Sequence, residues 1–364
     1  MKSPIIIDAH QDIAYNMVCF GRDYRHSALE IRAREAGSPI PQAANGQSVL
    51  GWPEYQQGRI AVIFATLFVL PRKYKASPFE RVDFETPQEA YRLTSAQMDI
   101  YRRLVEESPD KFALITTRTE LANLIAAWKD RPDESHPVGL VLSMEGAEGV
   151  SGEAELEEWW QKGVRLIGPV WAGTRFCGGT YEGGKFTPEG FHLLEIMQEL
   201  GYTLDIAHMN EGSALQALER YEGAIIASHA NVRALLQEDP HSRHLPDSVI
   251  RRLVERDGVI GVVPFNRFLK PDWKNSDPRE LVRLEMVVDH IDAICQIAGD
   301  ALHAGIGTGY GGGFGWPAIP LEMDTIADLP KLAQPLLAHG YSLADIESIF
   351  YGNWQRLLER TLPA

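Results

Sequence analysis

Two histidines, His208 and His229, each follow closely on a short apolar segment of the sequence. The segments are 203–206 and 224–227, and the polar stretch between them, 212–221, has apolar residues at helical spacing. This pattern is typical of a strand, a helix and a second strand parallel to the first. Because neighbouring strands lie about 4.8 Å apart, imidazoles past their carboxyl ends can converge on one metal ion. The alternative is two unrelated loop histidines, and this stretch alone does not decide between them.

One more histidine and two carboxylates occupy similar places. His10 and Asp12 follow the apolar run 5–7, and their spacing of two puts both side chains on one side of an extended backbone. As a bare pattern, His-x-Asp is common by chance. Glu145 follows the apolar run 138–143 and precedes a glycine. A carboxylate in that position is either a metal-binding or catalytic group, or a cap for the next helix.

These residues need a scaffold, and the apolar segments predict one. We expect eight strands, at about 5–9, 60–68, 138–143, 164–170, 203–207, 224–228, 259–263 and 303–307, with a minor extra strand at 112–116. We expect helices at 86–107, 187–201, 212–221 (between Asn210 as N-cap and Gly223 as stop), 281–298 and 343–358. Strands that alternate with helices indicate a parallel sheet, and eight of them indicate a closed (β/α)8 TIM barrel.

We interpret the whole chain, 1–364, as a single barrel domain. The polar segment 22–58, rich in Gly, Pro and Arg, is expected to leave the barrel as a rim insertion, and extra helices are expected at the carboxyl end. Barrel enzymes place their sites at the carboxyl ends of the strands, which is where the three imidazoles and two carboxylates fall. This set suits two divalent metal ions with Glu145 bridging them, and the mixture of imidazole and carboxylate ligands favours zinc over other metals.

Composition narrows the range of partners. The chain has 35 Lys and Arg against 50 Asp and Glu, a formal charge of −15, which argues against nucleic acids and anionic membranes as partners. The three cysteines are far apart, so a disulfide framework or thiolate metal site is not expected. The amino-terminal sequence lacks the pattern of a signal peptide. These features predict a cytoplasmic protein.

Several of these motifs together resemble the membrane (renal) dipeptidase family of the amidohydrolase superfamily, over nearly the whole chain. The similar segments are IIIDAHQD, SMEGAEG, LDIAHMN, ASHANVRAL, PHSRHLPD, the GIG from Gly305 and YGNWQRLL. The resemblance implies a barrel with two zinc ions that hydrolyses dipeptides, often with a D-residue or an unusual amide. It implies that His10, Asp12, Glu145, His208 and His229 are the metal ligands.

The resemblance also implies a substrate site. Arg243 matches an arginine that holds the substrate carboxylate, which suits the two-pronged geometry of a guanidinium. The substrate-contacting tyrosine of the family appears here as Phe265. A histidine that stabilises the developing oxyanion in the family is replaced by Trp171, which can only donate through its indole N–H. The eighth-strand aspartate that handles the proton of the attacking hydroxide is replaced by Gly309.

Each of these two replacements carries a cost in rate. Loss of a positioned proton carrier removes roughly 10² to 10⁴ in rate, and loss of an oxyanion donor removes about 10² to 10³. The first hypothesis is therefore a zinc-dependent hydrolase of dipeptides or related small amides, in which Glu145 positions the attacking group and Arg243, Trp171 and Phe265 contact the substrate. The alternative is an impaired or non-catalytic relative, with one metal ion or none, that binds a small amino-acid-like ligand or a partner protein. A homodimer is possible in either case.

Overall fold

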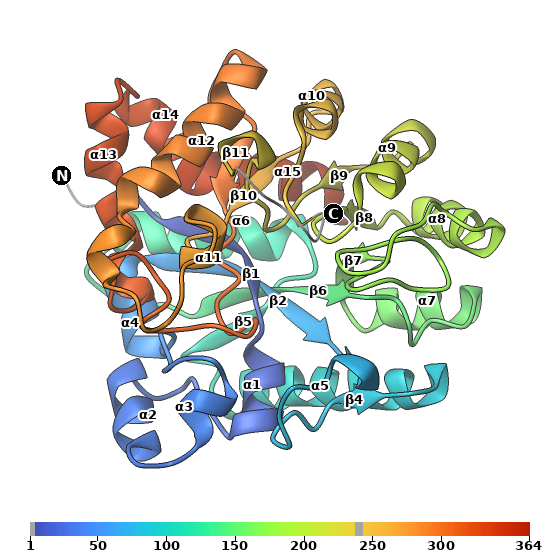
Figure 1. Ribbon diagram of the computed structural model, residues 1–364, viewed down its shortest axis with the longest axis horizontal. Coiled ribbons are helices and arrows are strands. Elements are labelled where there is room, and N and C mark those ends of the chain that lie inside the picture. Colours follow the sequence, from blue (N-terminus) through green and yellow to red (C-terminus); the bar gives the residue numbers. More distant parts are fainter. Residues whose placement is uncertain (1–3, 237–242) are drawn as a thin grey trace.

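The computed structural model describes residues 4–236 and 243–364, and its centre is a ring of parallel strands (Figure 1). The eight strands of the ring are β1 (Ile6–Gln11), β2 (Ile60–Phe68), β6 (Val138–Glu145), β7 (Val164–Gly168), β8 (Thr203–Asp205), β9 (Ile225–Ile226), β10 (Ile260–Val262) and β11 (Ala304–Ile306). They pair in the order β10-β11-β1-β2-β6-β7-β8-β9, and a bridge between Ala227 and Ile260 closes the ring. The predicted (β/α)8 barrel and its eight strand positions are confirmed.

The expected minor strand is present as β5 (Phe112–Leu114). It pairs with the first residues of β6, Val138 to Leu140, whereas β7 pairs with the last four, Leu142 to Glu145. Strand β6 therefore serves two neighbours on one edge, which explains why β5 lies off the ring. A separate two-stranded sheet, β3 (Leu70–Pro71) with β4 (Asp83–Phe84), extends from the end of β2.

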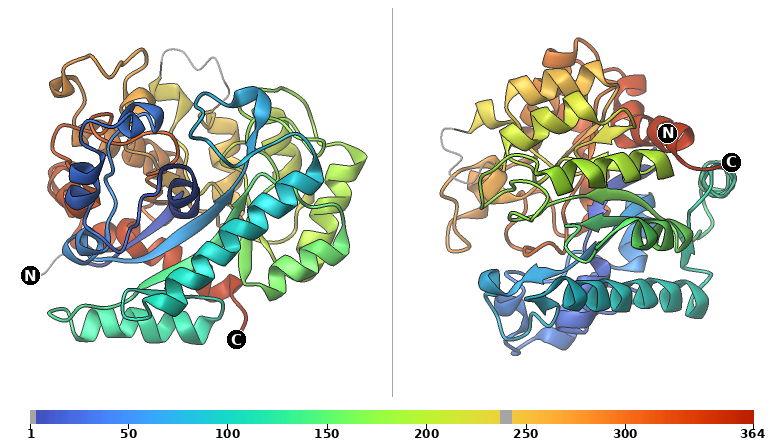
Figure 2. Two further views of the ribbon diagram at one scale, coloured as in Figure 1. Left: turned by 90° about the horizontal axis from the view of Figure 1, so that it is seen from below. Right: turned by 90° about the vertical axis from the view of Figure 1, so that its right-hand side faces the viewer.

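Helices surround the ring, and the long α5 crosses one side of it (cyan in Figure 2). Those between and beside the strands are α1 (Ile13–Phe20), α5 (Pro87–Glu107), α6 (Arg118–Asp130), α7 (Glu153–Gln161), α8 (Pro188–Leu200), α9 (Glu211–Arg220), α10 (Asp247–Glu255), α11 (Asn266–Leu269) and α12 (Leu284–Ala298).

Capping side chains start several of these helices where the sequence predicts. Thr86, Thr187 and Asn210 each accept a backbone N–H from the first turn, of α5, α8 and α9 respectively. Gly201 ends α8 with φ at 85°, a value that suits glycine. The expected stop at Gly223 is wrong, because α9 already ends at Arg220 with an extended residue after it.

The rim insertion contains more structure than its composition suggested. It folds into α2 (Ala28–Glu35), α3 (Ile40–Ala43) and α4 (Trp52–Gly58), of which α2 and α3 lie at the lower left of Figure 1. Within the insertion, Arg22 and Glu35 form a buried ion pair with Arg22 Nε 2.7 Å from Glu35 Oε1, and Arg22 Nη1 also donates to Asn16 of α1, which ties the insertion to the barrel. The insertion is thus held at a defined place on the rim.

The last turns of the carboxyl-terminal segment pack against β11 and β1 of the ring. The segment comprises α13 (Ala333–Ala338), α14 (Leu343–Glu347), the π-helical turn Ser348–Gly352 and α15 (Asn353–Thr361). Trp354 is fully buried, and its indole N–H donates to the carbonyl of Ile306 in β11. Short 3-10 turns lie at Arg72–Tyr74, Arg233–Leu235, Arg279–Leu281 and Ile326–Leu332.

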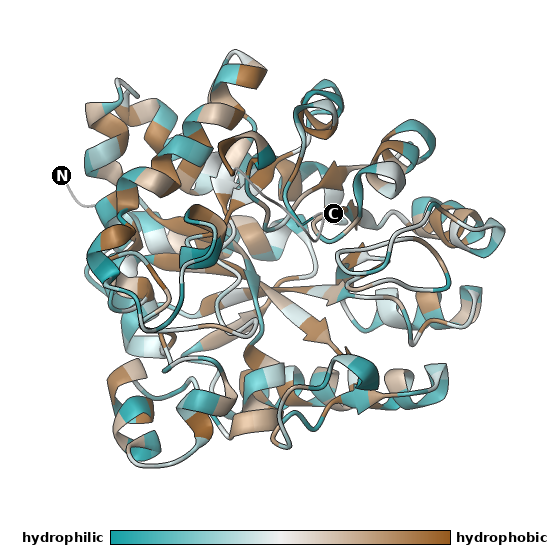
Figure 3. Cartoon of the chain, viewed as in Figure 1, coloured by the Kyte–Doolittle hydropathy of each residue, from teal (hydrophilic) through white to brown (hydrophobic). Residues whose placement is uncertain are grey.

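Apolar side chains fill the ring and the layer between strands and helices, as the brown strands and mixed outer helices of Figure 3 show. Strand β2 is buried along its full length, as expected for a sheet covered on one face by helices and filled on the other by the barrel core. Among the described residues, no helix combines the length and apolar character that crossing a bilayer requires.

Candidate metal centre and substrate cavity

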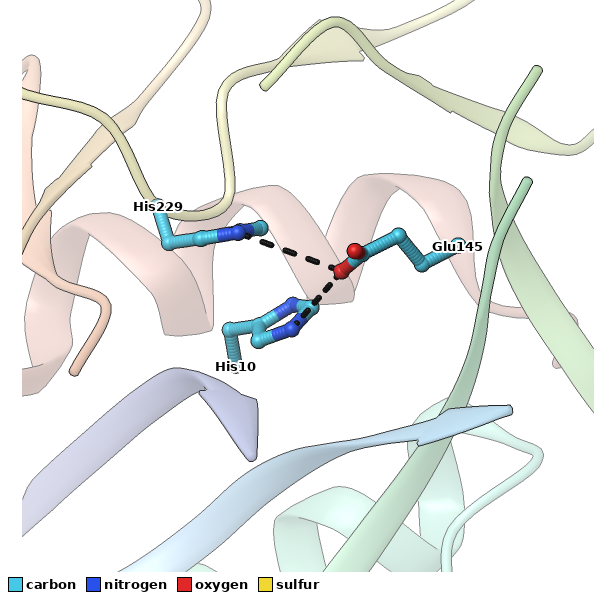
Figure 4. Close-up of side chains that lie close together, drawn as sticks. All are labelled: His10, Glu145 and His229. Atoms are coloured by element: carbon cyan, nitrogen blue, oxygen red, sulfur yellow. Dashed lines mark ion pairs between the residues drawn. The ribbon is translucent and has the colours of Figure 1, made fainter. Parts of the chain in front are cut away.

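The five residues predicted as ligands meet at the carboxyl ends of the strands. His10 lies in β1, Asp12 directly follows that strand, and Glu145 is the last residue of β6. His208 and His229 lie in the loops after β8 and β9. Figure 4 shows His10, Glu145 and His229 pointing toward one another from three separate segments. The sequence therefore correctly predicts that these side chains converge.

Glu145 lies at the middle of the group. Its Oε2 is 2.9 Å from His10 Nε2 and 3.9 Å from His229 Nε2, and its Oε1 is 3.5 Å from His208 Nε2. Asp12 Oδ2 is 3.3 Å from His10 Nε2. Potential ligand atoms of His10, Glu145 and His229 all lie within 4.8 Å of one another. A bridging position for Glu145 fits these distances.

Hydrogen bonds among the described residues leave several of these polar atoms unsatisfied. Asp12 Oδ1 is buried and accepts no hydrogen bond from any residue that the structure describes, and buried Glu145 Oε2 has its ion-pair contact with His10 Nε2 but no well-aligned hydrogen bond from the described residues. The Nε2 atoms of His208 and His229 lie 3.0 Å apart, so each directs its ring nitrogen at the other. Burying such atoms without partners is unfavourable, whereas imidazole nitrogens and carboxylate oxygens are the usual ligands of zinc. The donor set therefore fits a divalent metal ion.

Neighbouring hydroxyl groups fix the orientation of two imidazoles. Ser228 Oγ donates to Asp205 Oδ2, so it is available to accept the Nδ1–H of His229, which lies 2.8 Å away. This leaves the lone pair of His229 on Nε2, facing Glu145. Thr180 Oγ1 lies 2.8 Å from Nδ1 of His208 in the same way. Metal-binding histidines are commonly held through their second nitrogen like this.

The pKa shifts show a site prepared for a cation. Burial works against a charge on His10, but Asp12 and Glu145 outweigh it and raise the pKa of His10 to about 10. Burial, with the nearby positive charges of Arg243 and His10, lowers the pKa of both His208 and His229 well below its usual value. The carboxylates thus attract positive charge, while two neutral imidazoles offer lone pairs.

A cavity of about 370 Å³ opens above these residues, large enough for a small ligand such as a dipeptide. Arg243 lines it and is buried, with Nη1 donating to the carbonyl of Ala207 and Nη2 to that of His229. Its guanidinium lies 5.1 Å from the centre of the Phe268 ring. Pro240, His241 and Ser242 of the surrounding PHSRHLPD segment lie outside the described residues.

The loops after β10 and β11 bring a stacked aromatic pair to one side of the cavity. Phe265 and Phe314 stack with ring centres 4.1 Å apart, and both are buried. Gly309 lies beside them with φ at 65°, and a Cβ added there would lie 3.7 Å from His229 and 3.6 Å from Phe314. A side chain at position 309 would therefore point toward the metal-binding group, and Gly309 leaves that place without a carboxylate.

On the other side of the cavity, Trp171 follows β7 and lies next to the predicted ligands. Its ring centre is 6.2 Å from that of His208, and it also contacts the ring of Phe68 at 5.4 Å. Trp171 therefore lies within reach of a ligand in this cavity. Gly309 and Trp171, the two positions at which the sequence predicts replacements, line the same cavity as the five predicted ligands.

The sequence as a whole matches one family of proteins. The family model described as membrane dipeptidase, peptidase family M19, matches residues 1–362 of the chain. The chain belongs to the membrane dipeptidase family. Members of this family are metal-dependent peptidases, in agreement with the resemblance drawn from the motifs.

Relatives include dipeptidases and a protein without an assigned activity. The chain is 29% identical over 273 residues to an uncharacterised protein in the pqqA 5′ region of Klebsiella pneumoniae, covering 72% of this chain and 94% of that one. It is 23% identical over 317 residues to the dipeptidase aclJ of Aspergillus oryzae, covering 84% and 68%. A metallo peptidase from Rhodobacter sphaeroides, liganded with a phosphinate mimic of the dipeptide L-Ala-D-Ala, shares the fold, with a TM-score of 0.78, 23% identity, and 99% and 100% coverage.

Some features of this dipeptidase-family site were not found from the sequence. Thr180 lies in a glycine-rich loop whose spacing gives no sign that it reaches His208. Ser228 could have been found, because it directly precedes His229. Asp205 accepts a hydrogen bond from Ser228 Oγ, which in turn contacts Nδ1 of His229. His192 is exposed on α8 beside Glu195, outside the residues that line the cavity.

Proposed function

We propose that this protein is a zinc-dependent hydrolase of dipeptides or related small amides. The observation that carries the proposal is the convergence of His10, Asp12, Glu145, His208 and His229, with buried oxygens that accept no well-aligned hydrogen bond from the described residues. We assign these five side chains as ligands of two zinc ions, with Glu145 between them. The dipeptidases among its relatives, and the dipeptide mimic bound to the Rhodobacter protein, support the choice of substrate.

The metal centre would provide the electrophile, and the residues of the chain would hold the imidazoles and the attacking group in position. When bound, the ions polarise the scissile carbonyl and activate a water molecule at neutral pH. Ser228 and Thr180 hold the imidazoles of His229 and His208 in place, which keeps the ligand set rigid. Glu145 positions the attacking group between its neighbours. Each of these roles depends on side chains that are buried and fixed by their surroundings.

Arg243 and two aromatic residues would position the substrate. Arg243 lies beside the carbonyls of Ala207 and His229, so its positive charge is close to the metal centre and suits a substrate carboxylate. Phe265 and Trp171 line the cavity from opposite sides. Neither can accept a proton, so their contribution is to shape and desolvate the cavity.

The replacements at Gly309 and Trp171 predict slow turnover. No carboxylate at position 309 can take the proton of the attacking water, although the backbone there points toward His229. We infer a rate below that of a complete site by roughly 10² to 10⁴ for the missing proton carrier. The effect of the missing oxyanion donor need not multiply with it, because such groups act together.

Gly309 and its apolar neighbours also favour a second candidate function. A relative that has lost catalysis could bind a small amino-acid-like ligand, or a partner protein, and could hold one metal ion or none. The stacked Phe265 and Phe314, which flank Gly309, are consistent with binding and not with proton transfer. Under both candidates, a single domain, a homodimer and a cytoplasmic location stay predictions.

One experiment separates the two candidates. Metal content per chain is measured on protein purified without added zinc, and hydrolysis of a broad dipeptide panel is then followed on the same sample, with and without a chelator. About two metal ions per chain and turnover that the chelator abolishes would support the hydrolase. One ion or none, with no turnover, would contradict it and favour the binding protein. Activity that resists the chelator would contradict a metal-dependent mechanism.

A further inference from the structure

A group of four aromatic side chains forms one side of the cavity, and we name it the Trp171 cluster: Phe68, Tyr74, Trp171 and Tyr181. The Trp171 ring centre lies 5.4 Å from Phe68, 5.6 Å from Tyr74 and 5.3 Å from Tyr181. Tyr74 and Tyr181 also contact each other, at 5.3 Å. The cluster is a continuous aromatic surface that starts beside His208 and extends outward.

The Trp171 cluster lies across the metal centre from the Phe265–Phe314 pair. In the order of the ring, β6 and β7 are opposite β10 and β11. Trp171 and Tyr181 follow β7, whereas Phe265 and Phe314 follow β10 and β11. A ligand whose reacting bond lies over the predicted ligands therefore has one aromatic wall on each side.

The two walls differ in what their rings already contact. Phe265 and Phe314 are stacked within 20° of parallel and buried, so each covers a face of the other. Around Trp171 the rings of Tyr74 and Tyr181 stand at 84° and 63°, and Tyr181 is 47% exposed. Exposed aromatic surface inside a cavity is typical of a site for an apolar group of a ligand. The Trp171 cluster has room for such a group, and the stacked pair does not.

Positive and negative side chains line different sides of the cavity. Arg243 and Arg267 line it beside Phe268 and Phe265, on the side of β10. Glu80 lines it on the other side, where its carboxylate accepts hydrogen bonds from Tyr15 Oη and from the backbone N–H groups of Ala76 and Ser77. A dipeptide zwitterion fits with its carboxylate toward the arginines and its ammonium toward Glu80. This orientation directs the side chain of its first residue to the Trp171 cluster.

A lysine at the outer edge narrows the class of side chain. Lys73 Nζ lies 5.4 Å from the ring centre of Tyr74 and 2.6 Å from Glu182, so a cation already lies against this ring. Because Lys73 already occupies both the face of this ring and the carboxylate of Glu182, a second cation would have to displace it to gain the same contacts. The remaining surface favours an aromatic or large apolar side chain over that of lysine or arginine.

We propose that the Trp171 cluster is the subsite for the side chain of the substrate's amino-terminal residue, and that this side chain is aromatic or large and apolar. The inference rests on the function proposed above, since it takes a dipeptide as the substrate. Discrimination between side chains by an apolar pocket reaches about 10- to 200-fold. We therefore expect kcat/KM for Phe-Gly to exceed that for Ala-Gly and for Lys-Gly at least about tenfold.

The test replaces Tyr181, the most exposed ring of the cluster, in the full-length protein. Tyr181→Ala is expected to reduce the preference for Phe-Gly over Ala-Gly about three- to tenfold, because one ring contact is lost, while Tyr181→Phe retains it. Tyr91→Ala is the matched control, because Tyr91 lies on α5, outside the residues that line the cavity. Equal rates for Phe-Gly and Ala-Gly in the parent, or a preference that Tyr181→Ala leaves intact, would overturn the subsite.

A second measurement keeps the subsite testable if no dipeptide is hydrolysed, an outcome that would sink the hydrolase proposal alone. Calorimetric titration then compares phenylalaninamide with alaninamide, neither of which needs to be cleaved. Tighter binding of phenylalaninamide that weakens in Tyr181→Ala supports the subsite. Equal affinity, or no binding of either compound, refutes it.

Discussion

The mouth of the barrel has two halves that differ in chemistry. The half formed after β1, β6, β8 and β9 carries all the predicted ligands, and hydroxyl groups contact the second nitrogens of His208 and His229. The half formed after β10 and β11 carries Phe265, Phe314 and Gly309, a buried aromatic stack beside a residue without a side chain. The first, the polar half, is rigidly oriented. The second, the apolar half, contains Arg267, but none of its residues that line the cavity has a carboxylate or an imidazole.

This difference shows that holding a metal ion and moving a proton are separate requirements on a barrel. The first depends on several side chains that meet at one point, so loss of any one exposes buried charge to unfavourable surroundings. The second depends on single groups at single positions. A site of this kind can keep its affinity for metal while its rate of catalysis falls, and the two properties should respond to different substitutions.

Removing a ligand from the polar half should have the largest effect. His229→Ala is expected to lower metal content per chain and to reduce kcat/KM at least about a thousandfold, since metal polarisation contributes several kcal/mol to catalysis. Metal analysis and dipeptide kinetics on the same sample measure both. His192→Ala is the control, because this histidine is exposed on α8. Unchanged metal content in His229→Ala would remove His229 from the ligand set.

Adding a carboxylate to the apolar half should have the next largest effect, in the opposite direction. Gly309→Asp is expected to raise kcat/KM at least about 10²-fold, because an aspartate there would face His229 and could accept a proton. The backbone has φ at 65°, which aspartate tolerates better than most residues. Combining it with Trp171→His should add to the gain.

The matched control for this gain is Gly309→Asn, which has the same size and shape but cannot take the proton. If both variants are accelerated equally, the missing carboxylate is not what limits the rate. If the parent is already fast, the reading of Gly309 as a catalytic loss is wrong.

Disturbing the support of a ligand should have a smaller effect than removing the ligand. Ser228→Ala deletes the hydroxyl that contacts Nδ1 of His229 and is expected to weaken metal affinity about 10- to 100-fold. Competition with a chelator of known affinity measures this change. Ser248→Ala is the control, because Ser248 is exposed on α10 and its hydroxyl donates to Glu211. Equal affinity in Ser228→Ala and the parent would show that the hydroxyl plays no part in holding the metal.

Stability, and not metal affinity, should respond to a buried carboxyl near the polar half. Burial raises the pKa of Glu148 from 4.5 to about 8, and the charge of Glu145 adds to this. The folded protein therefore holds a proton that the unfolded chain releases, so stability falls as pH rises from about 4.5 to 8. Glu148→Gln, which cannot titrate, should gain stability over the parent by about tenfold in the folding equilibrium per pH unit across that range. Urea unfolding at several pH values checks this, and a pH-independent difference would contradict it.

Much of the fold could be predicted because its signals are local. Each strand is a short apolar run, and helix starts such as Thr86, Thr187 and Asn210 are marked by capping side chains. The three helices of the rim insertion were missed, because its polar composition hides their short apolar contacts. Gly223 was misjudged as a helix stop because a glycine shows where a left-handed residue is allowed and not where one is used.

The residues of the site also fall into a group that local sequence patterns predict and a group that they do not. The five predicted ligands lie at or shortly after the carboxyl ends of apolar strands, so the topology alone brings their side chains together. The contact of Thr180 with His208, and the meeting of Tyr74 and Tyr181 around Trp171, depend on how long loops fold back over the barrel. Loop geometry has no periodic pattern in sequence, and so these contacts could only be read from the structure.

The ring of strands can close only late in the synthesis of the chain. Strand β1 pairs with β11, and Thr308 donates its N–H to Asp8, three hundred positions earlier in the chain. The indole N–H of Trp354, still later in the chain, donates to Ile306 at the end of β11. On the ribosome, His10 is therefore made early but waits, beside an open sheet edge, until almost all of the chain has been synthesised. Contacts this distant slow folding and prolong the exposure of apolar surface. The edge of β1 that pairs with β11 therefore stays exposed until that last strand is made.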